Sequence, residues 1–75
     1  MTFEDLINQR PRPVKISVEQ ASEMMGVTQQ FLRIGLQQER FPFGVGVKMA
    51  GWAYYVNTER FIQYMQGGRV ANGAV

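Results

Sequence analysis

The sequence contains neither cysteine nor histidine among its 75 residues. Without cysteine, the chain can form no disulfide and no thiolate metal site. Without histidine, it lacks the side chain that most often serves as a general base and as a metal ligand. The neighbouring acids, Glu4 with Asp5 and Glu19 with Glu23, have no such partner and are explained by solvated helix faces. We therefore expect no metal, no other cofactor and no enzymatic activity.

Long apolar runs are also missing, since none approaches the ~20 residues that a membrane-spanning helix needs. The N-terminal residues are acidic where a secretory signal would carry lysines, and no apolar stretch follows them. We therefore expect a soluble, cytoplasmic protein with no membrane partner. A chain of this length forms one domain with a thin core, which argues against a deep catalytic cavity.

The charge balance is mildly basic. Eight Lys and Arg residues face six Asp and Glu residues, for a net charge of +2 and a pI of about 9.4. This balance is compatible with a nucleic-acid partner, but many small domains without one share it. The positions of the charges therefore carry more information than their sum.

The N-terminal segment is divided by prolines. Thr2 can cap a short helix that ends at Gln9, because Pro11 and Pro13 force the residues before them into extended backbone. Residues 14–16 then form a short strand. We expect three regions: an N-terminal arm at 1–13, a folded domain at 14–66 and a loose tail at 67–75. The basic residues near the arm follow a phosphate backbone, enter the minor groove or belong to a solvated linker: Arg10, Arg12 and Lys15.

Two short helices follow. Ser17 and Gln20 form a capping-box pattern that begins the first helix, and Gly26 ends it. Thr28 caps the second helix only two residues later. We expect this second helix to bury one face, Phe31, Leu32, Gly35 and Leu36, and to expose the other, Gln29, Gln30, Arg33 and Gln37.

Beyond Pro42 the hydrophobic period changes to that of strands. Residues 43–48 and 52–56 predict two strands joined by a tight turn at 49–51, and Asn57 caps a last helix with an apolar stripe. The aromatic residues here either stack on nucleic-acid bases or fill the core. We expect the second, with Trp52 and Tyr54 facing inward and Tyr55 the most exposed; the set is Phe41, Phe43, Trp52, Tyr54 and Tyr55. The predicted fold class is α+β, as a small winged helix-turn-helix domain.

This order of elements favours DNA binding. In a helix-turn-helix the second helix presents polar side chains to the major groove, where arginine pairs with guanine and glutamine with adenine. The helix N-terminus can meet a phosphate, and Lys48 beside the hairpin turn can touch a phosphate or the minor groove. The alternatives are an ordinary solvated helix face and a hairpin that only covers the core. The candidate DNA-binding residues are Thr28, Gln29, Gln30, Arg33, Gln37, Arg40 and Lys48.

The stretch from Ile16 to Arg33, ISVEQASEMMGVTQQFLR, resembles the opening of the excisionase family, which is related to the MerR-type winged helices. The resemblance extends over about residues 14–66. It implies a recombination directionality factor or small transcription regulator of a phage or mobile element. Such proteins bind and bend double-stranded DNA, often assemble cooperatively on it, and contact an integrase or recombinase. The implied contacts are Thr28, Gln29, Gln30 and Arg33 on the second helix, with a wing contact near Lys48.

The chain departs from that family in three ways. Arg33 is alone on a helix that often carries more basic residues, Glu39 replaces a common glycine, and the hairpin has little charge. These departures favour binding in a cooperative array or with a partner. A protein-interaction module without DNA binding stays an alternative, which an exposed apolar patch of Ile34 with Phe3 or Tyr64 would support. A DNA-packaging protein of the small-terminase type is another, although such proteins usually carry a long oligomerisation region.

Overall fold

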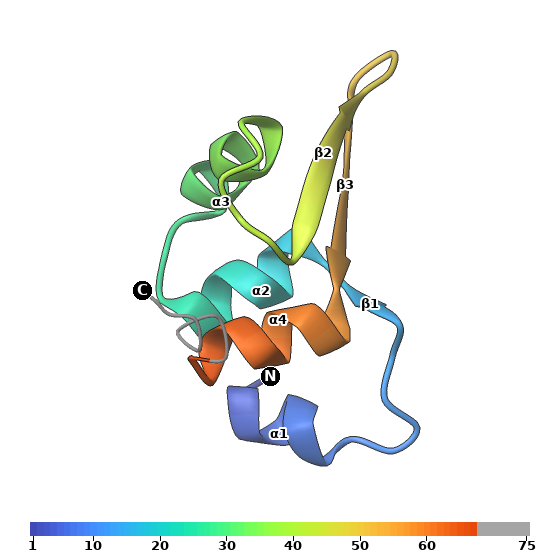
Figure 1. The fold of residues 1–75 in the computed structure, drawn as a ribbon, viewed down its shortest axis with the longest axis vertical. Coiled ribbons are helices and arrows are strands. Elements are labelled where there is room, and N and C mark those ends of the chain that lie inside the picture. The colour runs from blue at the N-terminus through green and yellow to red at the C-terminus, as the bar shows by residue number, and fades with distance from the viewer. Residues whose placement is uncertain (68–75) are drawn as a thin grey trace.

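The computed structural model describes residues 1–67, which form four helices and a three-stranded antiparallel sheet (Figure 1). The prediction of a small α+β domain is confirmed at this level. No helix within residues 1–67 is long and apolar enough to cross a membrane. The predicted tail lies outside the described residues except for Gly67. The elements are α1 (Phe3–Asn8), β1 (Lys15–Ile16), α2 (Val18–Met25), α3 (Gln29–Gln37), β2 (Gly44–Lys48), β3 (Trp52–Asn57) and α4 (Thr58–Met65).

Each helix begins at the capping residue that the sequence predicts. The capping side chains accept a hydrogen bond from the backbone N–H three residues later, at 2.9–3.0 Å, and so satisfy a donor that the helix leaves unpaired. At α1 and α2 the bond is reciprocal, which completes a capping box. The caps are Thr2, Ser17, Thr28 and Asn57.

The sheet has the order β1-β3-β2, with β3 in the middle. Ile16 of β1 pairs with Val56, and β2 pairs with β3 along its whole length, from Gly44 opposite Val56 to Lys48 opposite Trp52. The β2–β3 hairpin is therefore the predicted one, and its turn is closed by the Met49 N–H, which donates to the Gly51 carbonyl at 2.7 Å.

The core lies between the helices and the base of the hairpin. Phe43 and Phe61 are at its centre, with ring centroids 5.1 Å apart in an edge-to-face arrangement. Leu6 of α1 is fully buried in the same core, so the N-terminal helix packs on the rest of the domain. The buried apolar residues are Leu6, Ile16, Ala21, Leu32, Leu36, Phe43, Val56, Phe61 and Ile62.

Two residues that the sequence places inward lie outside this core. Phe31 is 56% exposed, because α3 turns Leu32, Gly35 and Leu36 towards the core and leaves Phe31 at the edge of that face. Trp52 is 39% exposed, because it stands at the far end of the hairpin, beyond the buried Val56. Both predictions of burial are wrong. The exposure predicted for Tyr55 is confirmed.

The turn between α2 and α3 depends on Gly26, which has a φ of 76° in the left-handed region. A Cβ at this position would meet nothing within 4 Å, so a substitution is penalised by backbone strain alone. We expect Gly26→Val to lower the free energy of unfolding by about 1–2 kcal/mol, measured by chemical denaturation. Gly26→Asn is the control, since asparagine tolerates this conformation. Equal losses for the two variants would contradict the backbone explanation.

At the end of α3, a residue other than glycine adopts the left-handed backbone conformation. Glu39 has a φ of 57°, and the next N–H, that of Arg40, donates to the Gly35 carbonyl at 2.8 Å. This is the position where helices usually place glycine. We expect Glu39→Gly to raise the free energy of unfolding by about 1 kcal/mol. The neighbouring Gln38→Gly, at a φ of −93°, should bring no gain in the same denaturation experiment. An unchanged stability of Glu39→Gly would contradict the strain at this position.

Candidate nucleic-acid interface

Helix α3 exposes two different flanks on either side of its buried face. One carries Gln29, Arg33 and Gln37, which are spaced four residues apart and therefore form a row along the helix. The other carries Phe31 and Ile34, which are 56% and 43% exposed. Three of the four residues of the predicted polar face thus form one flank, the polar row, where they are partly buried. On the apolar flank, the exposure of Ile34 was considered from the sequence, whereas that of Phe31 was not.

The hairpin is attached to the C-terminal end of the polar row. The Gln37 side-chain amide donates to the Tyr54 hydroxyl at 2.7 Å. A Cβ at Gly46 would lie 3.1 Å from the Tyr54 ring and 3.3 Å from the Gln37 backbone nitrogen, so β2 packs closely against this turn of α3. The helix and the hairpin, which lie side by side in Figure 1, are therefore joined in a defined relative position.

A basic hollow lies between α3, β3 and the start of α2. Its lining includes Lys15, Gln20, Arg33 and Tyr54, and no carboxylate of the described residues takes part in it. Arg33 donates to the Gln29 side-chain oxygen at 2.7 Å, which steadies the guanidinium along the helix and leaves its other N–H groups able to donate. The hollow thus combines two positive charges with donor and acceptor groups, the set that contacts phosphates and base edges.

The N-terminal end of α3 has a different electrostatic environment. Thr28 and Gln29 border a second hollow that also contains Glu19 and Glu23. The N-terminal ammonium of Met1 lies 3.7 Å from the Glu23 carboxylate and offsets part of this charge. Since carboxylates repel phosphates, this geometry opposes the phosphate contact predicted at the N-terminus of α3. It moves the candidate interface towards Arg33 and Gln37.

The other three predicted DNA-binding residues lie in three different places. Gln30 lies exposed on the outer side of α3, next in sequence to the polar row. Lys48 lies at the end of β2, with its ammonium 5.7 Å from the centroid of the Trp52 ring. Arg40 instead lines a hollow on the apolar flank, with Phe31, Ile34 and Phe41. The structure therefore does not bring Arg40 together with Arg33.

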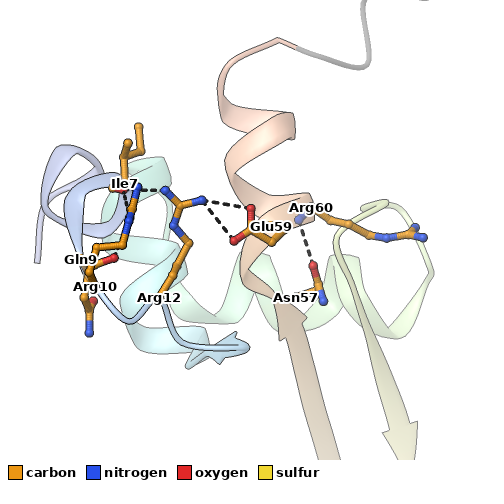
Figure 2. Close-up of polar contacts among 7 residues, drawn as sticks. All are labelled: Ile7, Gln9, Arg10, Arg12, Asn57, Glu59 and Arg60. Carbon is orange, nitrogen blue, oxygen red and sulfur yellow. Dashed lines mark hydrogen bonds and ion pairs between the residues drawn. The ribbon is translucent and has the colours of Figure 1, made fainter.

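The predicted basic arm is folded back onto the domain (Figure 2). Both oxygens of Glu59 on α4 accept from Arg12, at 3.0 and 3.1 Å, and the Ile7 carbonyl accepts from it at 2.6 Å. Arg10 donates to the carbonyls of Ile7 and Gln9, at 2.8 and 2.7 Å. Arg12 thus links α1 to α4, whereas the bonds of Arg10 stay within the N-terminal segment. A phosphate contact by either arginine stays a prediction. Lys15, the third basic residue of the predicted arm, lines the basic hollow of the candidate interface.

Sequence reasoning missed the part that Tyr54 and Lys15 take in this surface. Tyr54 was expected only as a core residue, whereas it is partly buried and joins the hairpin to α3. Lys15 was assigned to the arm, although its strand β1 pairs with β3 and so brings it beside Arg33. Pairing between segments this far apart in the chain leaves no local pattern that would have revealed it.

No protein-family model, no curated protein and no solved structure matches this chain. The function is therefore inferred from the chemistry and geometry of this surface together with the sequence resemblance of residues 16–33.

Proposed function

We propose that the protein binds double-stranded DNA as a winged helix-turn-helix protein, with α3 in the major groove and the β2–β3 hairpin as the wing. The observation that carries this proposal is the fixed pairing of the polar row of α3 with the hairpin, next to the basic hollow of Lys15 and Arg33. A positively charged, hydrogen-bonding surface built on a helix and an adjacent hairpin suits a groove with phosphates on both sides.

The dimensions and side chains of α3 fit this role. Its nine residues extend over about 13 Å along the helix axis. The major groove of B-DNA is ~12 Å wide, and an α-helix fits across that width. Arg33 can pair with guanine and Gln30 with adenine. The exposed Ile34 beside them offers an apolar contact to a thymine methyl group.

The biological role that we propose follows the sequence resemblance of residues 16–33. It is that of an excisionase-like recombination directionality factor or a small transcriptional regulator. Few basic groups face the candidate interface, so a single copy makes few phosphate contacts. This supports binding as a cooperative array on DNA or together with an integrase or recombinase.

The experiment is a gel-shift titration with duplex fragments from the protein's own genetic locus, at low and at physiological salt. A discrete, salt-sensitive shift on one fragment would support specific binding, and a ladder of larger complexes would support cooperative assembly. We expect the affinity to fall with salt with a log–log slope of about −2 to −3, as for two or three phosphate contacts. No shift at either salt, with folding shown by circular dichroism, would contradict the proposal.

A second candidate is a protein-docking module, favoured by the apolar flank of α3. Phe31 and Ile34 are exposed on both sides of a hollow that Phe41 also lines. The patch suggested by the sequence, Ile34 with Phe3 or Tyr64, is not the one found, because Phe3 and Tyr64 pack against the core. A folded protein that fails to bind any duplex would shift the assignment to this candidate.

A further inference from the structure

Helix α3 borders a hollow of about 380 Å³ on its apolar flank. We infer that this hollow binds a small organic acid, an aromatic or aliphatic carboxylate, and that the bound acid competes with DNA for α3. The binding of the acid does not depend on the proposed function, whereas the competition with DNA rests on it. The lining is mostly apolar and carries one cation; it consists of Phe31, Ile34, Gly35, Gln38, Arg40 and Phe41.

The floor of the hollow is the ring of Phe41, which the core holds in place. A Cβ at Gly35 would overlap this ring, so the ring lies directly against the backbone of α3. The ring is stacked on that of the buried Phe43, with centroids 5.1 Å apart, and meets that of Tyr64 edge-to-face at 6.2 Å. Because these contacts exist without a ligand, binding requires little ordering of the floor, which lowers its entropic cost.

The walls are apolar side chains that the fold leaves exposed. Phe31 is 56% exposed, with its ring centroid 6.2 Å from that of Phe41, and Ile34 is 43% exposed. Small-molecule sites are hollows of roughly 300–1,000 Å³ with mostly apolar linings and a few polar groups. The hollow on α3 is near the lower end of that range, so it suits a ligand with a single ring or a short alkyl chain.

The polar end of the hollow selects a carboxylate. The Arg40 guanidinium has no hydrogen-bond or ion-pair partner among residues 1–67, and Glu39, which precedes it, forms no ion pair with it. No carboxylate within the described part of the chain lines the hollow, and the Gln38 side-chain amide adds a further donor. Two N–H groups of a guanidinium match the two oxygens of a carboxylate. An acid with an apolar body therefore satisfies both the cation and the walls.

Ile34 connects this hollow to DNA binding. The proposed function places Ile34 against a thymine methyl group in the major groove. A ligand on Ile34 would cover this contact and would add a negative charge beside the phosphates, which repel it. Since ligands that exclude each other lower each other's affinity by the same factor, the acid should release the protein from DNA.

The test uses 3-phenylpropanoate as the acid and 3-phenylpropanamide as its neutral match. Titration of the intact protein, followed by two-dimensional NMR of backbone amides and isoleucine methyl groups, should give saturable shifts at Ile34, Gly35 and Arg40. We expect a Kd of about 0.1–3 mM for the acid, as for a ligand of this size. The amide should bind about two- to fivefold more weakly, because an exposed ion pair contributes modestly.

Two variants assign the contacts. Arg40→Gln should weaken the acid by about two- to fivefold and remove its preference over the amide. Phe31→Ala should weaken the acid and the amide alike, because it removes an apolar wall. Arg60→Gln is the matched control, since it removes an exposed arginine on α4 with the same change in net charge, and it should bind the acid as the wild type does.

The competition is measured with a labelled duplex from the protein's own locus. At about ten times its own Kd, the acid should raise the Kd of the duplex by roughly tenfold. Sodium acetate at the same concentration controls for ionic strength and should raise it much less. A wild type that binds the acid but no duplex would overturn the proposed function and the competition, and would leave the acid site standing.

The other outcomes decide the inference itself. Shifts that do not saturate or that lie outside the hollow would overturn it, and so would equal affinities of the wild type for the acid and the amide. Saturable binding of the acid with an unchanged duplex affinity would overturn the competition. A second copy seated on the hollow, shown by concentration-dependent sedimentation that Ile34→Ser abolishes, would overturn the assignment to a small acid.

Discussion

Arg33→Ala is expected to weaken binding to the specific duplex by ~1–3 kcal/mol, or about 5- to 150-fold, with a smaller effect on an unrelated duplex. The reason is that Arg33 is central on the polar row and is already oriented by its bond to Gln29. A guanidinium so placed can bond to two acceptors of one guanine, which contributes specificity as well as charge. Fluorescence anisotropy with the specific and the unrelated duplex in competition measures both effects.

Two further variants make this experiment specific. Arg33→Lys keeps the charge but not the planar pair of donors, so it should restore unspecific binding more than specific binding. Arg60→Ala is the matched control, because Arg60 is exposed beside Val45 and Tyr55, away from α3. A folded Arg33→Ala protein that binds every duplex as the wild type does would contradict the assignment of α3 as the recognition helix.

Gly44→Ala is expected to destabilise the fold by about 3 kcal/mol or more, which is the upper end of the cost of overpacking. A Cβ at Gly44 would overlap the Tyr55 carbonyl oxygen and lie 3.2 Å from the Val56 Cα. These are backbone atoms of the central strand, so they cannot move aside as a side chain would. The strain would fall where the hairpin joins the core, next to the buried Phe43.

Gly51→Ala provides the control in the same hairpin. A Cβ at Gly51 would meet nothing within 4 Å, and this glycine has no positive φ. Denaturant unfolding should therefore show a wild-type midpoint for Gly51→Ala and a much lower one for Gly44→Ala. Equal midpoints for the two variants would contradict the close approach of β2 and β3 at Gly44.

The elements that were predicted correctly from the sequence are those that neighbouring residues determine. Ser17 and Asn57 begin helices because their side chains bond to an N–H only three residues away. Gly26 ends α2 because few other residues adopt its φ. The polar row of α3 is also determined by neighbouring residues, because it follows from helical periodicity alone.

The errors involve contacts between distant segments. Arg12 was expected either to contact nucleic acid or to lie in a solvated linker, yet it is paired with Glu59, which is 47 positions away. Phe31 has the composition of a core residue, and only the final packing of α3 decides that it lies outside. Trp52 was misplaced because the alternation of a strand identifies its side but not how far the core reaches along it. Within the candidate site, Arg40 lies on the apolar flank of α3, away from Arg33, and the long-range pairing of β1 with β3 brings Lys15 in.

The close packing of Gly46 against Gln37 has a consequence for the length of any DNA site. Because β2 packs against α3 at this point, the proposed function implies a constant distance between the bases read by the helix and the backbone met by the hairpin. Inserting one base pair between those two points shifts them by about 3.4 Å along the duplex and rotates them about its axis. The protein would then lose one of the two contacts. Its sites should therefore vary in sequence under the hairpin but keep a constant spacing between the two contacts.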